Sequence, residues 1–292
     1  MYSNSRTSKS TAGFFEQLAQ LRRCLDQADA VVVGAGAGLS AAAGLTYSGE
    51  RFHAHFADFE RKYGIQDMYS GGFYPFATRE EYWAWWSRHI LINRYDAPPG
   101  APYLNLRRLL EGRDFFVLTT NVDHQFQLSG FPKRRLFYTQ GDYGLWQCAR
   151  ACHAKTYENE SAVREMAARQ RDMRIPSELV PRCPVCGAPM TVNLRSDDTF
   201  VEDDGWREAQ ARYNAFLKEH RQANVLYLEL GVGLNTPGII KLPFWAYTYE
   251  NPRATYACVN LGQAFCPPEI ESRSLLLDGD LGEALKQLAE GV

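Results

Sequence analysis

Short apolar runs recur along this chain, and each of them ends in glycine or in small polar residues. The five runs span residues 30–33, 115–118, 225–230, 255–259 and 274–277. Apart from Glu229, they lack the polar alternation of a sheet with one solvated face. Such runs are typical of strands that are buried on both faces of a parallel sheet. The pattern predicts an α/β fold with a Rossmann-like parallel sheet, in which ligands bind at the carboxyl ends of the strands.

Two stretches do not follow this strand pattern. Residues 47–95 hold 14 of the 38 aromatic residues, and residues 148–186 carry two cysteine pairs around a charged stretch, 159–174, that we expect to be helical. A chain of 292 residues has room for about two domains of roughly 150 residues each. We predict that both stretches are insertions that together form a smaller domain. The predicted division assigns 1–46, 98–147 and 191–292 to the Rossmann-like domain, 47–97 to a helical aromatic-rich insertion and 148–190 to a zinc-binding module.

The aromatic stretch has two interpretations. Its side chains either line an apolar channel for an acyl or aromatic group, or they form the core of a small helical module. We favour the core, because a small module needs large side chains to bury enough apolar surface.

Charge and hydropathy exclude several classes of protein. Lysine and arginine total 32 and aspartate and glutamate total 34, so the net charge of −2 lacks the basic footprint of a nucleic-acid-binding protein. No run approaches the roughly 20 apolar residues of a membrane-spanning helix. Residues 1–11 are polar with no apolar segment behind them, unlike a signal peptide. We therefore expect a cytoplasmic protein with neither nucleic-acid nor membrane partners.

A glycine-rich segment follows the first apolar run. Residues 36–41, Gly-Ala-Gly-Leu-Ser-Ala, fit the G-x-G-x-x-G/A pattern between a strand and a helix. Glycines at such a turn let the backbone approach a pyrophosphate, and the start of the helix favours its negative charge. A tight strand-to-helix turn without a ligand would have the same sequence. The acidic residue that dehydrogenases carry about 20 positions later has no convincing counterpart here.

Four of the seven cysteines form two close pairs in the middle of the chain. The pairs are Cys148 with Cys152 and Cys183 with Cys186. Two such pairs can supply four thiolate ligands to one zinc ion, and a closed site of that kind is structural. His153 is a possible substitute for one cysteine, and four reduced cysteines without a metal remain the alternative.

Polar residues follow the run at 115–118. Asn121 and Asp123 are expected at the sheet edge that also carries the glycine segment, where an amide and a carboxylate can bind a ligand amide and orient a sugar. Both residue types also serve as helix N-caps, so a structural role is the alternative. Gln140 and Gly141 follow residues 137–139 and read equally well as an ordinary strand end.

Taken together, these motifs resemble the sirtuin family in sequence and in order. Residues 36–45 are similar to the family's GAG-[IV]-S-A-x-x-G-I, and residues 119–123 to its T-Q-N-I-D. Gln140-Gly141 falls at the family's His-Gly, and the cysteine pairs fall at its zinc module. Residues 231–234 resemble its GTSL, Val259-Asn260 its I-N, and Gly279-Asp280 its C-terminal adenine-pocket segment. The resemblance extends from about residue 28 to residue 290.

The resemblance implies NAD⁺ bound between a Rossmann domain and a small zinc domain. Nicotinamide would leave, and an acceptor would capture the ribose C1′. The residues implied are Gly36, Ala37, Gly38 and Ser40 at the phosphates, Gly231 and Gly233 on their far side, Asn260 at the adenosine ribose, Asp280 at the adenine, Asp123 at the nicotinamide carboxamide and Asn121 at the nicotinamide ribose.

One departure from the family pattern concerns its catalytic base. Gln140 replaces the histidine that activates a ribose hydroxyl for acyl transfer, and an amide cannot take a proton near pH 7; general-base help of this kind is worth roughly 10²–10⁴-fold. The chain thus resembles the macrodomain-linked (class M) sirtuins. That resemblance implies mono-ADP-ribosylation of a lipoylated, glycine-cleavage-H-like carrier protein, with a macrodomain hydrolase acting on the same target.

Two other functions remain open at the level of the sequence. An NAD⁺-dependent protein deacylase is disfavoured by the missing imidazole. A non-catalytic protein that senses NAD⁺ or ADP-ribose is compatible with Gln140, although such a protein has less chemical reason to keep both Asn121 and Asp123.

Overall fold

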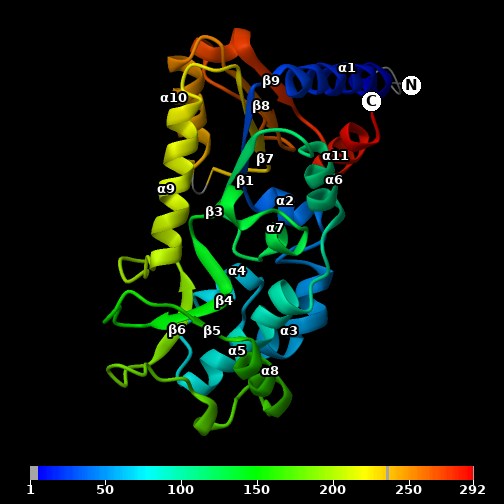
Figure 1. Ribbon diagram of the computed structural model, residues 1–292. Coiled ribbons are helices and arrows are strands. Elements are labelled where there is room, and N and C mark those ends of the chain that lie inside the picture. Colours follow the sequence, from blue (N-terminus) through cyan, green and yellow to red (C-terminus); the bar gives the residue numbers. More distant parts are fainter. Residues whose placement is uncertain (1–5, 235–236, 292) are drawn as a thin grey trace, which may run out of the picture.

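A six-stranded parallel sheet forms the centre of the larger domain in the computed structural model, which describes residues 6–234 and 237–291 (Figure 1). The strand order is β3-β2-β1-β7-β8-β9, and every neighbouring pair is parallel. The strands are β1 (Ala30–Ala35), β2 (Phe115–Thr119), β3 (Leu136–Tyr138), β7 (Val225–Leu230), β8 (Thr255–Val259) and β9 (Ser274–Leu277). The predicted α/β, Rossmann-like class is confirmed, and all five apolar runs are strands.

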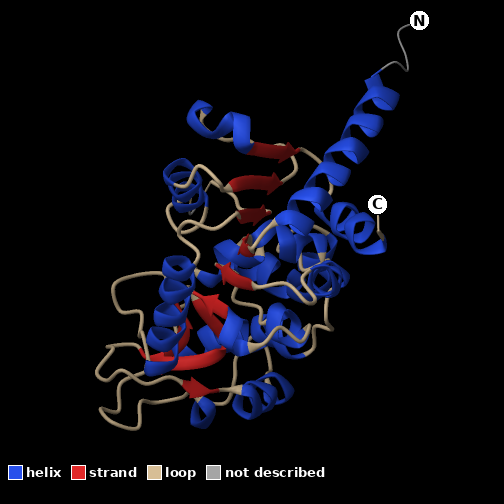
Figure 2. Ribbon diagram, turned by 45° about the horizontal axis from the view of Figure 1, so that its top comes forward, coloured by secondary structure: helices blue, strands red, loops and turns tan. Residues whose placement is uncertain are grey.

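Helices cover both faces of this sheet, as Figure 2 shows, so the strands are apolar on both sides. One layer contains α1 (Arg6–Gln27), α2 (Ala37–Ala42), α6 (Ala101–Leu109), α7 (Gln125–Leu128) and α11 (Leu281–Glu290). The opposite layer contains α9 (Asp204–Glu219), α10 (Lys241–Glu250) and the 3₁₀ turn η4 (Pro268–Arg273). Alternate residues of one strand enter the two cores: Val31 and Val33 of β1 pack on the first layer, and Val32 packs on the second.

The smaller domain is formed by two segments far apart in the sequence. The first contains α3 (Glu50–Tyr63), α4 (Met68–Gly72), α5 (Arg79–Ile90) and the π-helical turn η1 (Leu91–Tyr95). The second contains β4 (Gly141–Cys148), β5 (Tyr157–Glu158), α8 (Glu160–Arg169) and β6 (Met190–Leu194), with the strands in a separate antiparallel sheet of order β5-β4-β6. Short 3₁₀ turns, η2 (Lys133–Arg135) and η3 (Ser177–Leu179), lie in the connections.

One hydrophobic core joins the two inserted segments. Phe52, Phe56 and Trp85 of the first segment share it with Trp146 and Met190 of the second. The aromatic stretch therefore serves as the core of a small module, as the sequence favours. The antiparallel sheet starts at residue 141 and ends at residue 194, so it extends beyond the range 148–190 expected for the zinc-binding module.

Close approach of two loops explains the glycines at the edge of the parallel sheet. The strand order reverses between β1 and β7, and the loops that follow these two strands meet there: the Gly38 N–H donates to the Gly231 carbonyl at 2.9 Å. A Cβ at Gly38 would lie 2.7 Å from Gly231 Cα, and one at Gly36 would lie 2.8 Å from the Gly231 carbonyl oxygen. Any larger residue would push these loops apart. This reversal point is where open α/β sheets bind their ligands.

Within the described ranges, 6–234 and 237–291, no helix has both the length and the apolar character needed to cross a membrane.

Candidate functional site

A cavity of about 570 Å³ lies between the parallel sheet edge and the aromatic helices. From the large domain it is lined by the loops after β1, β2 and β3, and from the small domain by α4, α5 and the end of β6. The predicted residues that line it are Ala37, Ser40, Asn121, Asp123 and Gln140. The structure therefore brings together, in one cavity, residues that are up to 103 positions apart in the sequence.

Asn121 is held by two hydrogen bonds from its side-chain nitrogen. Its Nδ2 donates to the Gly36 carbonyl at 3.0 Å and to the Tyr103 hydroxyl at 3.1 Å, and its backbone N–H donates to Thr119 Oγ1. The side chain is only 9% exposed, so its orientation is set by the glycine loop and by α6. Asn121 thus physically connects the loop after β2 to the loop after β1.

Asp123 lies behind Asn121 in the same loop. Ser40 Oγ donates to its Oδ2 at 2.5 Å, and the Gln125 backbone N–H donates to its Oδ1 at 3.1 Å. Burial raises the pKa of the Asp123 carboxyl, and these two hydrogen bonds oppose that rise. The hydrogen bond from Gln125 closes a local turn just before α7. Asp123 therefore combines a structural turn with a buried carboxylate in the wall of the cavity.

Gln140 stands at the junction where the chain leaves the parallel sheet for the small domain. Its carbonyl accepts from the Arg195 backbone N–H at 3.0 Å. Gly141, with a φ of 95°, follows it, and a Cβ there would lie 1.9 Å from the Asn193 carbonyl oxygen. Because only glycine fits that turn, the position of Gln140 is set by the pairing of β4 with β6. Its side chain lines the cavity.

Arg195 is a cavity residue that sequence reasoning missed. It follows β6, its guanidinium pairs with Glu202 at 2.5 Å, and it lies over the rings of Phe200 and Trp206. Its positive charge is therefore paired with Glu202, while the residue also lines the cavity. No motif marks this arginine, since its place depends on the return of β6 to the edge of the large domain.

The aromatic wall of the cavity corresponds to the channel that was the less favoured interpretation of this stretch from its sequence. Tyr47, Tyr69, Phe73 and Trp86 line it, and Tyr69 and Phe73 are about 60% exposed. The aromatic stretch thus forms both a core and a channel wall, the two alternatives that the sequence left open. Its density of aromatic residues was the available signal, but spacing alone does not tell which rings face a cavity.

His89 is the one histidine among the described residues that line the cavity. It is fully buried, and burial together with the charge of Arg51 lowers its pKa to about 3. Neither ring nitrogen has a hydrogen-bond partner among the described residues. A histidine that resists protonation so strongly is a poor proton acceptor at neutral pH, so it does not replace the imidazole absent at Gln140.

The remaining predicted ligand residues lie at the large-domain end of the fold. Gly231 packs against the glycine loop, and a Cβ added at Gly233 would have no atom within 4 Å. Asn260 follows β8, and its Nδ2 donates to the Val232 carbonyl at 2.9 Å. Asp280 caps α11 by accepting from the Glu283 backbone N–H at 2.7 Å. These four residues do not line the 570 Å³ cavity, and neither do Gly36 and Gly38 of the glycine loop, where the cavity ends.

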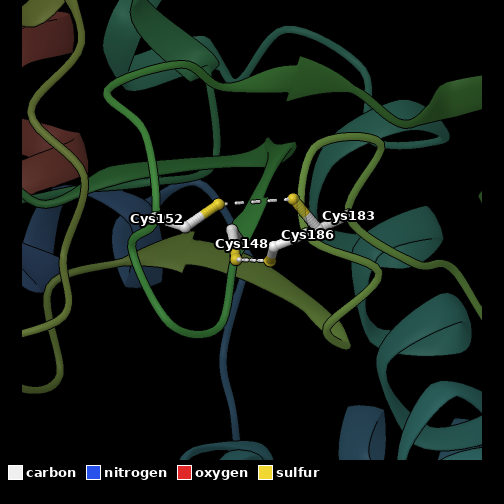
Figure 3. A group of neighbouring side chains, drawn as sticks. All are labelled: Cys148, Cys152, Cys183 and Cys186. Carbon is white, nitrogen blue, oxygen red and sulfur yellow. Dashed lines mark hydrogen bonds between the residues drawn. The ribbon is translucent and has the colours of Figure 1, made fainter.

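The four paired cysteines converge at one point, as Figure 3 shows. Their sulfurs all lie within 4.8 Å of one another, with Cys148 and Cys186 at 3.6 Å and Cys152 and Cys183 at 3.6 Å. Four thiolates around one zinc ion at about 2.3 Å would lie about 3.8 Å apart. The cluster therefore has the dimensions of a closed tetrahedral zinc site.

The pKa of the Cys148 and Cys183 thiols is lowered, whereas burial and the neighbouring cysteines raise the pKa of the Cys152 thiol. Burial opposes ionisation of Cys148, but N–H groups of Cys152 and Arg150 outweigh it and lower the pKa of the Cys148 thiol to about 6. His153 lies beside the cluster, with its Nδ1 3.0 Å from Cys152 Sγ and its Nε2 2.9 Å from the Tyr157 hydroxyl. Its contact with Tyr157 turns it toward the neighbouring strand, and the four cysteines form the ligand set by themselves.

Solved structures with this architecture are sirtuins. A Sir2Tm structure bound to a propionylated peptide matches with a TM-score of 0.61 and 19% identity, over 94% of this chain and 97% of that one. A structure titled as Sir2 with a p53 peptide and NAD⁺ matches with a TM-score of 0.59 and 19% identity, over 94% and 97%. A Sir2 homologue mutant in complex with ADP-ribose has a TM-score of 0.61 and 15% identity, over 93% and 94%. The fold thus defines the class as sirtuin-like.

Sequence comparison narrows this class. A protein from Staphylococcus aureus (strain Mu50 / ATCC 700699), named protein ADP-ribosyltransferase, is 43% identical over 91% of this chain and 85% of its own length. A Fusarium oxysporum f. sp. cubense protein, named probable bifunctional ADP-ribose hydrolase/ADP-ribosyltransferase, is 32% identical over 94% of this chain and 48% of its own length. No family model matches the chain. The chain belongs to the sirtuin family, as its motifs indicate.

Proposed function

We propose that this protein is an NAD⁺-dependent protein mono-ADP-ribosyltransferase that releases nicotinamide. The observation that carries the proposal is the composition of one cavity, in which Asn121 and Asp123 lie with Gln140 in place of a basic imidazole. The names of both relatives, protein ADP-ribosyltransferase and a bifunctional hydrolase/transferase, support the same activity.

The chain's own residues would orient the reaction more than they would move protons. Asp123 would hold the nicotinamide carboxamide, and Asn121 would orient the nicotinamide ribose, so that the C1′–nitrogen bond lies in a fixed position. As that bond breaks, nicotinamide leaves with the bonding electrons and C1′ gains positive charge. A nucleophilic atom of the acceptor protein then bonds to C1′ and gives up any proton to the solvent. Positioning of this kind contributes much of the rate in bond-making steps.

Gln140 separates this reaction from deacylation. An acyl transfer would need a base that removes a proton from a ribose hydroxyl. The Gln140 amide cannot act as that base near pH 7. His89, whose pKa is lowered to about 3, is also unsuited to that task. Direct attack of an acceptor on C1′ requires no such base. The site therefore supports transfer to a protein better than it supports acyl-lysine hydrolysis.

The phosphates would lie along the glycine loop. We assign Gly36, Ala37, Gly38 and Ser40 to one side of the pyrophosphate and Gly231 and Gly233 to the other, with Asn260 and Asp280 at the adenosine end. The contact between the two loops supports this assignment, because it places backbone N–H groups and the start of α2 at the same edge. Arg195 adds a guanidinium from the small domain.

Zinc would occupy the four-cysteine cluster as a structural ion. The donor set is saturated by Cys148, Cys152, Cys183 and Cys186, so no open position is left for a substrate. The ion would connect the start and the end of the second inserted segment, and thereby hold β4 and β6 in the small domain.

The acceptor that we propose is a lipoylated, glycine-cleavage-H-like carrier protein. An extended arm suits a cavity whose far wall is aromatic and whose rim carries the exposed rings of Tyr69 and Phe73. A macrodomain hydrolase acting on the same target is the partner that would reverse the modification. The name of the Fusarium relative, which gives both an ADP-ribose hydrolase and an ADP-ribosyltransferase, supports this pairing of transferase and hydrolase.

Transfer of a label from adenylate-labelled NAD⁺ to the carrier tests the proposal. The wild-type protein should label the lipoylated carrier and release one nicotinamide per label, and Asn121→Ala should reduce the label by about 100-fold or more. Asn251→Ala is the control, because it removes another buried asparagine, whose Nδ2 donates to Ala223, outside the cavity. NAD⁺ binding without nicotinamide release would instead identify a sensor, and rapid release of acyl-lysine product would identify a deacylase.

A further inference from the structure

Tyr103 of α6 connects two residues of the site without lining the cavity itself. Its ring is fully buried and meets Phe126 edge-on at 4.9 Å between centroids. Its hydroxyl lies 2.9 Å from Ser40 Oγ and 3.1 Å from Asn121 Nδ2. Nothing in the glycine or Asn-Asp motifs points to this tyrosine, which comes from a different segment of the chain.

The donors and acceptors in this group have only one consistent arrangement. The Asp123 carboxylate accepts the one proton of the Ser40 hydroxyl, so Ser40 must accept from Tyr103. The Tyr103 proton is then used, so its oxygen must accept from Asn121 Nδ2. A directed chain therefore runs from Asn121 through Tyr103 and Ser40 to Asp123.

The same chain determines which end of the Asn121 amide a ligand meets. A carbonyl can only accept, so the contact with Gly36 independently identifies the nearer amide atom as Nδ2. Both N–H groups of that nitrogen are thereby engaged, one by Gly36 and one by Tyr103. Asn121 Oδ1 accepts no hydrogen bond from the described residues, and the side chain lines the cavity. The group that it offers to a ligand is an acceptor.

We propose that Tyr103 is a positioning residue that holds Asn121 with its carbonyl oxygen toward the ligand, so that the site selects a hydrogen-bond donor there. Given the proposed function, on which this part rests, that donor is a hydroxyl of the nicotinamide ribose. An amide turned by 180° would present N–H groups instead and would lose its bonds to both Gly36 and Tyr103.

The free protein tests the positioning role without any assay of activity. In a sample labelled with ¹⁵N at asparagine, the two Asn121 side-chain protons should be distinct and protected from exchange with solvent. Tyr103→Phe, which removes only the hydroxyl, should raise the exchange rate of one of them by about 10-fold or more. An unchanged exchange rate in the Phe variant would overturn the proposal.

Kinetics then test what the orientation does. Tyr103→Phe should lower kcat for nicotinamide release by about 10- to 100-fold with little change in the KM for NAD⁺. Tyr256→Phe is the matched control, because it removes another buried hydroxyl, which donates to Glu229 at 2.6 Å and does not line the cavity. It should lower thermal stability and leave kcat unchanged. Equal kcat values for both variants would overturn the role of Tyr103, whereas absence of NAD⁺ cleavage in the wild type would refute the proposed function and leave the exchange result standing.

Discussion

The two walls of the cavity are held together by different kinds of interaction. On the parallel-sheet side, Ser40, Tyr103, Asn121 and Asp123 form an uninterrupted set of hydrogen bonds. On the aromatic side, the Trp86 indole nitrogen and both nitrogens of His89 have no partner among the described residues, although the Tyr82 hydroxyl bonds Thr191. Hydrogen bonds orient individual atoms, whereas apolar packing determines shape without orienting polar groups. We infer that the first wall performs the chemistry and that the second provides the space.

The strongest test of this contrast is removal of the metal site from the aromatic side. Without the cluster, the two inserted segments would be joined by their shared apolar core and by a few polar contacts, such as the one between Tyr82 and Thr191. Cys183→Ser should therefore abolish zinc binding and cost on the order of 10 kcal/mol of small-domain stability, as structural zinc does in other small modules. Zinc content measured by mass spectrometry and thermal unfolding followed by tryptophan fluorescence are the readouts.

Cys266→Ser is the control for that experiment, because Cys266 lies outside the cluster. It should keep one zinc ion and an unchanged transition. If the Cys183 variant unfolded at the same temperature as the wild type, the small domain would be stable without metal and the contrast between the two walls would need another basis.

A second test concerns paired charges on the parallel-sheet side. Lys241 Nζ lies 2.5 Å from Glu229 Oε1, both side chains are fully buried, and Tyr256 also donates to Glu229. Lys241→Met leaves the carboxylate buried without its cation, and should lower the free energy of unfolding by about 3–5 kcal/mol. Denaturant unfolding measures the change, with the exposed Lys286→Met as control. A decrease in the free energy of unfolding of less than 1 kcal/mol would show that the large domain does not depend on the ion pair between Lys241 and Glu229.

The smallest expected effect comes from the unpaired histidine of the aromatic side. The pKa of His89 is about 3 in the folded protein and 6.5 ordinarily, so between these values the unfolded chain binds the additional proton. Stability is therefore complete above about pH 6.5 and falls as the pH drops, by up to about 1.4 kcal/mol per pH unit.

His89→Phe removes this titration and adds no polar atom to the aromatic core. Its free energy of unfolding, measured from pH 7 to pH 5, should decline by about 2 kcal/mol less than that of the wild type. Parallel pH profiles for the two proteins would mean that His89 is protonated in the fold, and that the aromatic wall does supply it with a partner.

Much of the fold was predictable because its signals are local. Three expected strands, 225–230, 255–259 and 274–277, have the same bounds in the structure, since a run of apolar residues flanked by polar ones is buried as a unit. β3 was noticed only as a possible strand end at residues 137–139, and β5, with two residues, was too short to show a pattern. The boundary of the small domain also depends on the pairing of β4 with β6, a contact between segments some 45 residues apart.

The candidate site divides in the same way. Asn121, Asp123 and Gln140 were predicted because each follows a recognisable strand or matches a motif, and the structure places all three at one cavity. Arg195 was missed, since it has no neighbours in the sequence that mark it. His124 is a related case: it adopts a positive φ of 64° and bonds Asp142 at 2.5 Å, a contact that depends on the path of β4.

By itself, the order of residues determined the parallel sheet, the glycine loop and the four thiolates that can hold one metal ion, because each depends on short-range spacing or on burial of a continuous run. Only the folded chain decided which way the Asn121 amide points and which aromatic rings line the cavity. The direction of the amide requires the Tyr103 hydroxyl to meet Ser40 across 63 residues of sequence and Asn121 across 18. Hydrogen bonds act over about 3 Å in space, and separation along the chain does not reveal that proximity.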